Sequence, residues 1–159
     1  MIEGVTVKKL IVRDDVPDAD QKEIPRGILM EILRADDEFF RKFGQSTMSV
    51  AHKGTIKGFH WHEKQDDLWF IATGKIVVVL YDMRPESPTY RQTDTLFAGR
   101  DDYKLILIPT GVVHGYKVLS DEPAMLFYHT TEMYDPKNPD EKRLPFDDPK
   151  INFNWNKYE

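Results

Sequence analysis

The sequence contains no cysteine and no apolar run long enough to cross a membrane. Without cysteine there is no disulfide and no thiolate metal site, and this composition is compatible with a reducing cytoplasm, where we expect the protein. We expect neither a membrane span nor a secretory signal, because there is no apolar stretch near about 18 residues. Basic residues are also in deficit, at 22 against 27 acidic ones, and the net charge of −5 argues against general nucleic-acid binding.

Helical periodicity is nearly missing as well. Only the short amphipathic segment Asp36–Phe43, followed by Gly44, predicts a helix. From Gln45 onward, β-rich runs alternate with turn residues at nearly regular spacing, which predicts an all-β sandwich or barrel. The expected strands are Gln45–His52, Gly58–Glu63, Asp67–Thr73, Lys75–Asp82, Tyr90–Leu96, Tyr103–Ile108, Val113–Leu119 and Ala124–Thr131, preceded by Ile28–Leu33 and a weak strand within residues 1–22.

The length of 159 residues suits one domain with a sizeable core, so we expect a single domain over residues 1–159. Residues 1–22 are expected to form an amino-terminal arm, a strand followed by an acidic loop. Residues 134–159 are rich in Pro, Asp and Asn and have little periodicity. They nevertheless contain apolar side chains that predict a cover packed on the barrel: Phe146, Ile151, Phe153 and Trp155.

The segment from Gly54 to Gly74 holds the most informative residues. His60 and His62 are two positions apart on a predicted strand, so their imidazoles point to the same face. A carboxylate follows at Asp67, and another histidine, His114, comes directly after an apolar strand. Imidazole and carboxylate together suit a divalent ion such as Fe, Mn, Ni or Zn, and the spacing is that of a metal-binding cupin. Asp67 is one methylene shorter than the usual glutamate.

Several segments resemble a different branch of the cupins, the dTDP-4-dehydrorhamnose 3,5-epimerase family, roughly from Glu23 to Trp155. They are Pro25–Glu31, Ile56–His60, Ile108–Asp121, Tyr128–Pro136 and the closing pattern Asp147–Trp155. The resemblance implies a cupin double-stranded β-helix (jelly roll). It also implies a homodimer in which the amino-terminal arm, residues 1–22, is exchanged. The implied substrate is a dTDP-4-keto-6-deoxyhexose, epimerised at C3 and/or C5 in deoxysugar or cell-surface polysaccharide biosynthesis.

The same resemblance assigns roles to particular residues and implies no metal and no cofactor. His60 matches the base that removes a proton next to the ketone, oriented by the carboxylate of Asp148. Tyr128 matches the residue that returns a proton on the opposite face. The remaining matches are to substrate-binding positions, with Arg26 and Lys57 at the diphosphate: Arg26, Glu31, Gln45, Lys57 and His114.

Two departures keep other functions open. The family commonly has His-Tyr-Gln where this chain has His60-Trp61-His62, and it has a lysine near the enolate oxygen where this chain has Asp67. An anion there opposes a developing oxyanion unless it is protonated or binds a cation. The pair of histidines is also similar to that of nucleotide-sugar 3,4-ketoisomerases, which would use His60 and His62 as proton shuttles. The further alternatives are a metal-binding cupin and a sugar-nucleotide binding module without catalysis.

Overall fold

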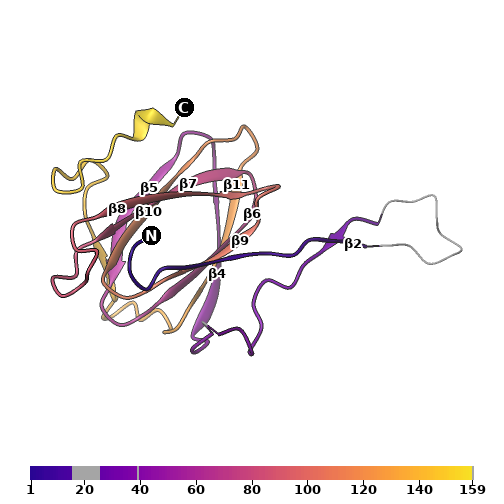
Figure 1. The fold of residues 1–159 in the computed structure, drawn as a ribbon, viewed down its shortest axis with the longest axis horizontal. Helices are drawn as coiled ribbons and strands as arrows, with labels where there is room; N and C mark the ends of the chain where they lie inside the picture. The colour runs from indigo at the N-terminus through magenta and orange to yellow at the C-terminus, as the bar shows by residue number, and fades with distance from the viewer. Residues whose placement is uncertain (16–25, 39, 159) are drawn as a thin grey trace, which may run out of the picture.

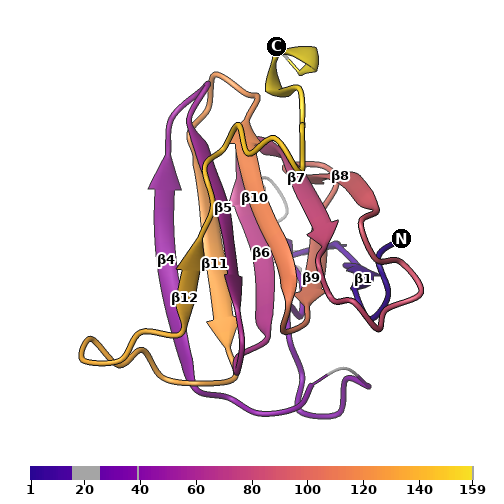
Figure 2. The same ribbon diagram turned by 90° about the vertical axis from the view of Figure 1, so that its left-hand side faces the viewer.

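The computed structural model describes residues 1–15, 26–38 and 40–158, and these form two antiparallel five-stranded sheets that face each other (Figures 1 and 2). The first sheet has the order β1 (Thr6–Lys9), β9 (Lys104–Ile108), β6 (Asp67–Thr73), β11 (Ala124–Thr130) and β4 (Gln45–Ala51). The second has the order β12 (Glu141–Arg143), β5 (Ile56–His62), β10 (Val112–Val118), β7 (Lys75–Asp82) and β8 (Thr93–Gly99). The fold is the predicted cupin jelly roll.

The main core lies between the two sheets. Strand β7 reads KIVVVLYD and is buried at every residue after Lys75. Its alternate side chains Ile76, Val78 and Leu80 belong to the cluster between the sheets, together with Ile106 and Leu126 from the first sheet. Alternate residues of a strand point to opposite faces, so the continuous apolar run requires that both faces of β7 be covered.

The carboxyl-terminal segment covers the outer face of the second sheet. Ile151 and Trp155 belong to one buried cluster with Phe59, Val79 and Val113, which lie on β5, β7 and β10. The 3-10 helix η1 (Trp155–Lys157) begins at Trp155, whose indole Nε1 donates a hydrogen bond to the carbonyl of Phe146 at 2.8 Å. This packing explains why an irregular segment carries large apolar side chains.

The predicted helix at Asp36–Phe43 is wrong. Phe39 lies outside the described residues; residues 36–38 form a turn, and residues 40–43 have no regular structure. The Asp37 carboxylate accepts from the backbone N–H of Arg34 at 2.9 Å and from Lys8 Nζ at 2.6 Å. Asp37 therefore closes a turn and ties it to β1. A stretch this short cannot recover the cost of helix nucleation unless it packs as a helix.

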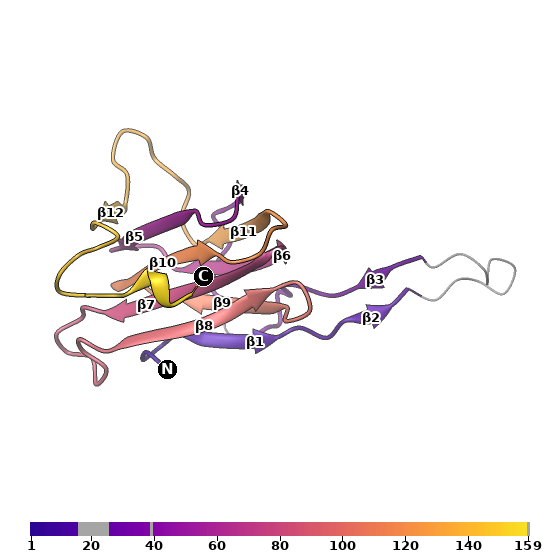
Figure 3. The same cartoon turned by 90° about the horizontal axis from the view of Figure 1, so that it is seen from above.

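Strands β2 (Arg13–Asp14) and β3 (Ile28–Leu29) form a separate two-stranded ladder. We call this ladder with its described flanking residues the arm, so that the arm comprises residues 13–15 and 26–31 and not the whole of residues 1–22. Figure 3 shows the arm extending beyond the two large sheets. Ile28 and Leu29 are 51% and 54% exposed, which is high for such apolar side chains. The acidic loop expected at the end of residues 1–22 lies largely within residues 16–25, outside the described residues, as does Pro25. Among the described residues, no helix has the length and apolarity to cross a membrane.

Candidate active site

A cavity of about 1380 Å³ opens between the two sheets. One wall is strand β5 and the other is formed by β4, β6 and β11, while the segment around β12 borders the opening. His114 is not among the lining residues, which include six others that the sequence singled out: Gln45, Lys57, His60, His62, Asp67 and Tyr128. The two-residue period of the strands thus brings side chains from both sheets into one space.

Three histidines meet at the inner end of this cavity. His60 and His62 lie on β5, and His114 on β10 is the register partner of His60. The ring centroids of His60 and His114 are 4.3 Å apart, and those of His62 and His114 are 5.5 Å apart. Glycine is required beside them, because a Cβ on Gly58 would lie 2.9 Å from the Cα of Gly115.

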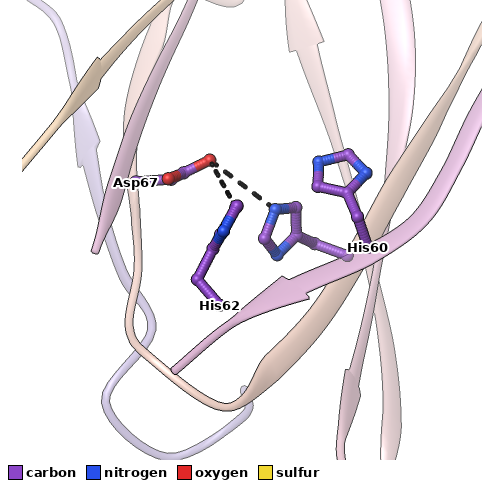
Figure 4. Close-up of side chains that lie close together, drawn as sticks. His60, His62 and Asp67 are labelled. Carbon is purple, nitrogen blue, oxygen red and sulfur yellow. Dashed lines mark ion pairs between the residues drawn. The ribbon is translucent and has the colours of Figure 1, made fainter. Parts of the chain in front are cut away.

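Asp67, at the start of β6, faces these histidines from the opposite sheet (Figure 4). Its Oδ2 lies 3.7 Å from His62 Nε2 and 3.6 Å from His114 Nε2. Gln65 Nε2 donates to Oδ1 at 2.8 Å, and Trp69 Nε1 donates to Oδ2 at 3.1 Å. The shorter aspartate therefore approaches two imidazoles, and two neutral donors fix the orientation of its carboxylate.

Burial governs the protonation of this cluster. It lowers the pKa of His60 well below the ordinary histidine value, and the neighbouring His114 lowers it further. Burial also lowers the pKa of His62. For Asp67 burial opposes ionisation, but His114 and His62 outweigh it and hold the pKa of this carboxyl below its usual range. Near neutral pH, His60 is a neutral imidazole that can accept a proton, and Asp67 is an anion.

Tyr128 approaches the cavity from the sheet opposite His60. On β11 it is paired in register with Trp69 of β6 and with Thr47 of β4. Burial raises the pKa of its hydroxyl, so Tyr128 is a protonated donor at neutral pH. The neighbouring His129 points to the other face of the strand, where its ring lies 6.4 Å from that of Phe43.

Two further predicted ligand residues lie at the cavity wall. Gln45 Nε2 donates to Thr47 Oγ1 at 3.2 Å, and its Oε1 accepts from the backbone N–H of Tyr134 at 2.7 Å. Lys57 Nζ donates to Ser49 Oγ at 2.6 Å. Lys57 is exposed and lies within reach of an anionic ligand that enters from solvent.

Arg26 and Glu31 do not join the cavity within one chain. Arg26 Nε lies 3.6 Å from Asp15 Oδ2, beyond the β2–β3 ladder at its end away from the two large sheets (Figure 3). Glu31 Oε1 accepts from Arg13 at 3.0 Å, and neither residue lines the cavity.

Asp148 is not the partner of His60 in this structure, which corrects the expected arrangement. Its Oδ1 accepts from the backbone N–H of Lys150 at 2.9 Å, and its carbonyl accepts from Asn152 at 2.8 Å. Within the part of the chain that the structure describes, Asp148 makes no hydrogen bond or ion pair with His60. Its side chain instead closes the turn before the buried Ile151. The carboxylate that faces the histidines is Asp67.

Sequence reasoning missed the contribution of β12. This short strand pairs with β5 and sets Arg143 opposite His60 in register, at the border of the cavity. Just before it, the Asp140 carboxylate accepts from the backbone N–H groups of Lys64 and Gln65 at 2.9 and 3.0 Å, which fixes the loop after β5. No signal identified β12, because its three residues are charged and exposed and show no alternation.

The cluster also has the composition of a metal site. His60, His62, Asp67 and His114 each offer one ligand atom, and these four atoms lie within 4.8 Å of one another. The same cavity therefore supports proton transfer by His60 and Tyr128 and offers donors for a divalent cation at its inner end.

Comparison with known proteins agrees with this geometry. The family model of dTDP-4-dehydrorhamnose 3,5-epimerase matches residues 18–159. The spore coat polysaccharide biosynthesis protein SpsL of Bacillus subtilis is 49% identical, over 98% of this chain and 97% of its own length. The probable low-salt glycan biosynthesis epimerase Agl13 of Haloferax volcanii is 39% identical, over 91% and 92%.

A solved structure shares the whole architecture. The dTDP sugar isomerase of Desulfovibrio desulfuricans superposes with a TM-score of 0.84 and 29% identity, over 98% of this chain and 92% of that one. The matched region contains both sheets, the cavity between them and the carboxyl-terminal cover. The chain belongs to the dTDP-4-dehydrorhamnose 3,5-epimerase family.

Proposed function

We propose that this protein is a nucleotide-sugar epimerase that acts on a dTDP-4-keto-6-deoxyhexose, at C3, C5 or both. The observation that carries the proposal is the placement of His60 and Tyr128 on opposite sheets of one cavity. Inversion at carbon needs a proton acceptor on one face of the sugar and a proton donor on the other. Family membership supplies the reaction class, and the names of the relatives place it in polysaccharide or glycan biosynthesis.

In this mechanism neutral His60 removes a proton from the carbon next to the ketone. The electron pair of the broken C–H bond moves to the ketone oxygen and forms an enolate. The Tyr128 hydroxyl then gives its proton to the same carbon from the opposite face, and the ketone re-forms. The lowered pKa of His60 and the raised pKa of Tyr128 give both groups the starting protonation state that this sequence of steps needs.

The diphosphate is assigned to Lys57 at the cavity wall and to Arg26 of a second copy of the chain. Within one chain Arg26 lies on the arm, away from the cavity. The exposed apolar side chains Ile28 and Leu29 on the same arm are suited to packing against a partner. We therefore propose a cytoplasmic homodimer in which each arm reaches the partner's cavity.

Incubation with dTDP-4-keto-6-deoxyglucose in deuterated water tests the reaction. Proton NMR should show the loss of the C3 or C5 proton signal, as deuterium replaces it, together with the signals of the epimerised product. A His60→Asn variant should show neither change. Absence of exchange at both carbons with the unmodified protein would contradict the proposal for this substrate.

The same experiment separates epimerisation from 3,4-ketoisomerisation. His62 lines the cavity beside His60, with ring centroids 5.9 Å apart, so a second imidazole is available as a shuttle between neighbouring carbons. A 3-keto product, recognised by a carbon-13 ketone signal at C3 in place of C4, would replace the epimerase assignment with the isomerase.

A further inference from the structure

At the inner end of the cavity the Asp67 carboxylate faces two imidazoles, His62 and His114, and, in the part of the chain that the structure describes, no lysine or arginine side chain. Asp67 is 3% exposed, and among the described residues no lysine or arginine forms an ion pair with it. Its two hydrogen-bond donors, Gln65 and Trp69, are neutral. A buried carboxylate without a compensating charge is costly, which points to a positive species beside it in the working protein.

His114 shows where that species lies. Its Nδ1 is 2.9 Å from the carbonyl oxygen of Val112, and a carbonyl can only accept, so Nδ1 carries the proton. In the neutral ring Nε2 then presents a lone pair, and this buried atom has no hydrogen-bond partner among the residues that the structure describes. It faces Asp67 Oδ2 at 3.6 Å. A lone pair and a carboxylate oxygen repel each other unless a proton or a metal ion lies between them.

We propose that His62, Asp67 and His114 hold a first-row divalent metal ion. Both imidazoles direct Nε2 toward the same oxygen, Asp67 Oδ2, at 3.7 and 3.6 Å. Ligand atoms bound at about 2.1 Å to one tetrahedral ion lie about 3.4 Å apart, so each of these two imidazole–carboxylate distances needs to shorten by only a few tenths of an ångström. Two histidines and one carboxylate form a donor set that such ions bind with open positions remaining.

The surroundings fit ligation as well as the donors do. Metal-bound histidines usually donate their second N–H to a carbonyl or carboxylate, as His114 does to Val112. The carboxylate is likewise held by Gln65 and Trp69. These contacts fix His114 and Asp67 before an ion enters, whereas the buried Nδ1 of His62 has no hydrogen-bond partner among the described residues.

His60 is left outside this set. Among the described residues it makes no ion-pair contact with Asp67, and its side chain is only partly buried, whereas His62 and His114 contact Asp67 and are 6% and 1% exposed. It therefore remains available as the base. A bound divalent ion is a Lewis acid that stabilises oxyanions, a role for which Asp67 alone has the wrong charge.

Metal binding can be measured without any substrate. Protein stripped with a chelator would be titrated with Co²⁺, followed by calorimetry and by the visible absorption of the bound ion. We expect one equivalent per chain, with affinity at least about 100-fold weaker in Asp67→Asn and in His62→Gln than in the unmodified protein. His60→Asn should change the affinity less than tenfold. The exposed His52 provides the matched control, and His52→Asn should change nothing.

Folding of each variant would be checked by thermal unfolding, in which Co²⁺ should raise the midpoint of the unmodified protein and of His60→Asn but not of Asp67→Asn. Failure to bind, or binding that Asp67→Asn leaves intact, overturns the site. Loss of binding in His60→Asn as large as in His62→Gln overturns the three-residue assignment.

The outcome is independent of the proposed function. If the protein exchanges sugar protons in D₂O but binds no metal, the proposed epimerase function stands and the proposed metal site is wrong. If it binds one metal ion per chain but exchanges no sugar proton, the metal site stands and the proposed function is wrong.

Discussion

The inner end of the cavity and the arm are built in opposite ways. His60, His62, Asp67 and His114 lie on central strands, where register on both sides fixes each side chain. Each strand of the arm is only two residues long. Arg26 and Glu31 form ion pairs with residues of the arm itself. Within one chain, the four residues of the cavity cluster already lie together, whereas the residues of the arm do not reach the cavity.

This difference separates two kinds of contribution to the same reaction. In the proposed function, the cluster takes part in proton transfer with the contacts of a single chain. The proposed homodimer brings the arm to a cavity only from a second copy. Changes in the cluster should therefore affect the chemical step, and changes in the arm should affect ligand binding and assembly.

Removal of the base should have the largest effect. His60→Asn should lower the rate of proton exchange at the sugar by about 10²–10⁴-fold, since this is the range that a positioned base contributes. The affinity for dTDP, measured by calorimetry, should change little, because His60 is proposed to act on the hexose and dTDP has no hexose on its diphosphate. A variant that retains exchange within tenfold would place the base elsewhere.

The effects of Asp67→Asn and Asp148→Asn on the exchange rate should show which of the two carboxylates acts with the histidines. Asp67→Asn should lower exchange by about 10²-fold, because the buried anion and whatever cation it holds are lost together. Asp148→Asn should lower exchange less than tenfold, since Asp148 accepts from Lys150 and has no contact with His60 in this structure. Steady-state kinetics of both variants decides this, and the reverse order of effects would restore Asp148 as the partner of the base.

Substitution in the arm should affect binding rather than chemistry. Arg26→Ala should weaken dTDP affinity by about tenfold or more, the loss expected for a charge-assisted contact to phosphate. The exchange rate at saturating substrate should stay within a few-fold. Arg100, an exposed arginine paired with Glu122 on another surface, provides the control, and Arg100→Ala should leave affinity unchanged. Equal effects of the two substitutions would mean that the arm has no specific part in binding.

Lys57→Arg should have the smallest effect and the opposite sign. Lys57 reaches Ser49 at the cavity wall, and a guanidinium at that position can grip a diphosphate with two parallel hydrogen bonds. We expect dTDP to bind a few-fold more tightly, as measured by calorimetry. Weaker binding would show that the wall is shaped around an ammonium group.

The sequence predicted the cluster better than it predicted the periphery. Asp67–Thr73 and Lys75–Asp82 are strands with the expected bounds. The two-residue period correctly placed His60 and His62 in one cavity, because local alternation determines side-chain direction in a paired strand. The family and the all-β jelly roll are likewise confirmed. The roles assigned to the site residues remain predictions.

Elsewhere tertiary contacts override the local pattern. The helical pattern at Asp36–Phe43 is lost because Asp37 is used to close a turn against Lys8. Strand β12 exists because β5 offers an edge to it, and three charged residues contain no sign of that. Asp148 precedes a proline in an irregular segment, so no periodicity could place its carboxylate.

Tyr128→Phe tests the central claim, that His60 and Tyr128 transfer protons on opposite faces of one sugar. With the phenol removed, His60 can still take a proton and return one to the same face. In deuterated water, NMR should therefore show deuterium at C3 or C5 in sugar that keeps its original configuration. Continued inversion in Tyr128→Phe, or complete loss of exchange in a variant that still folds and binds dTDP, would contradict the account.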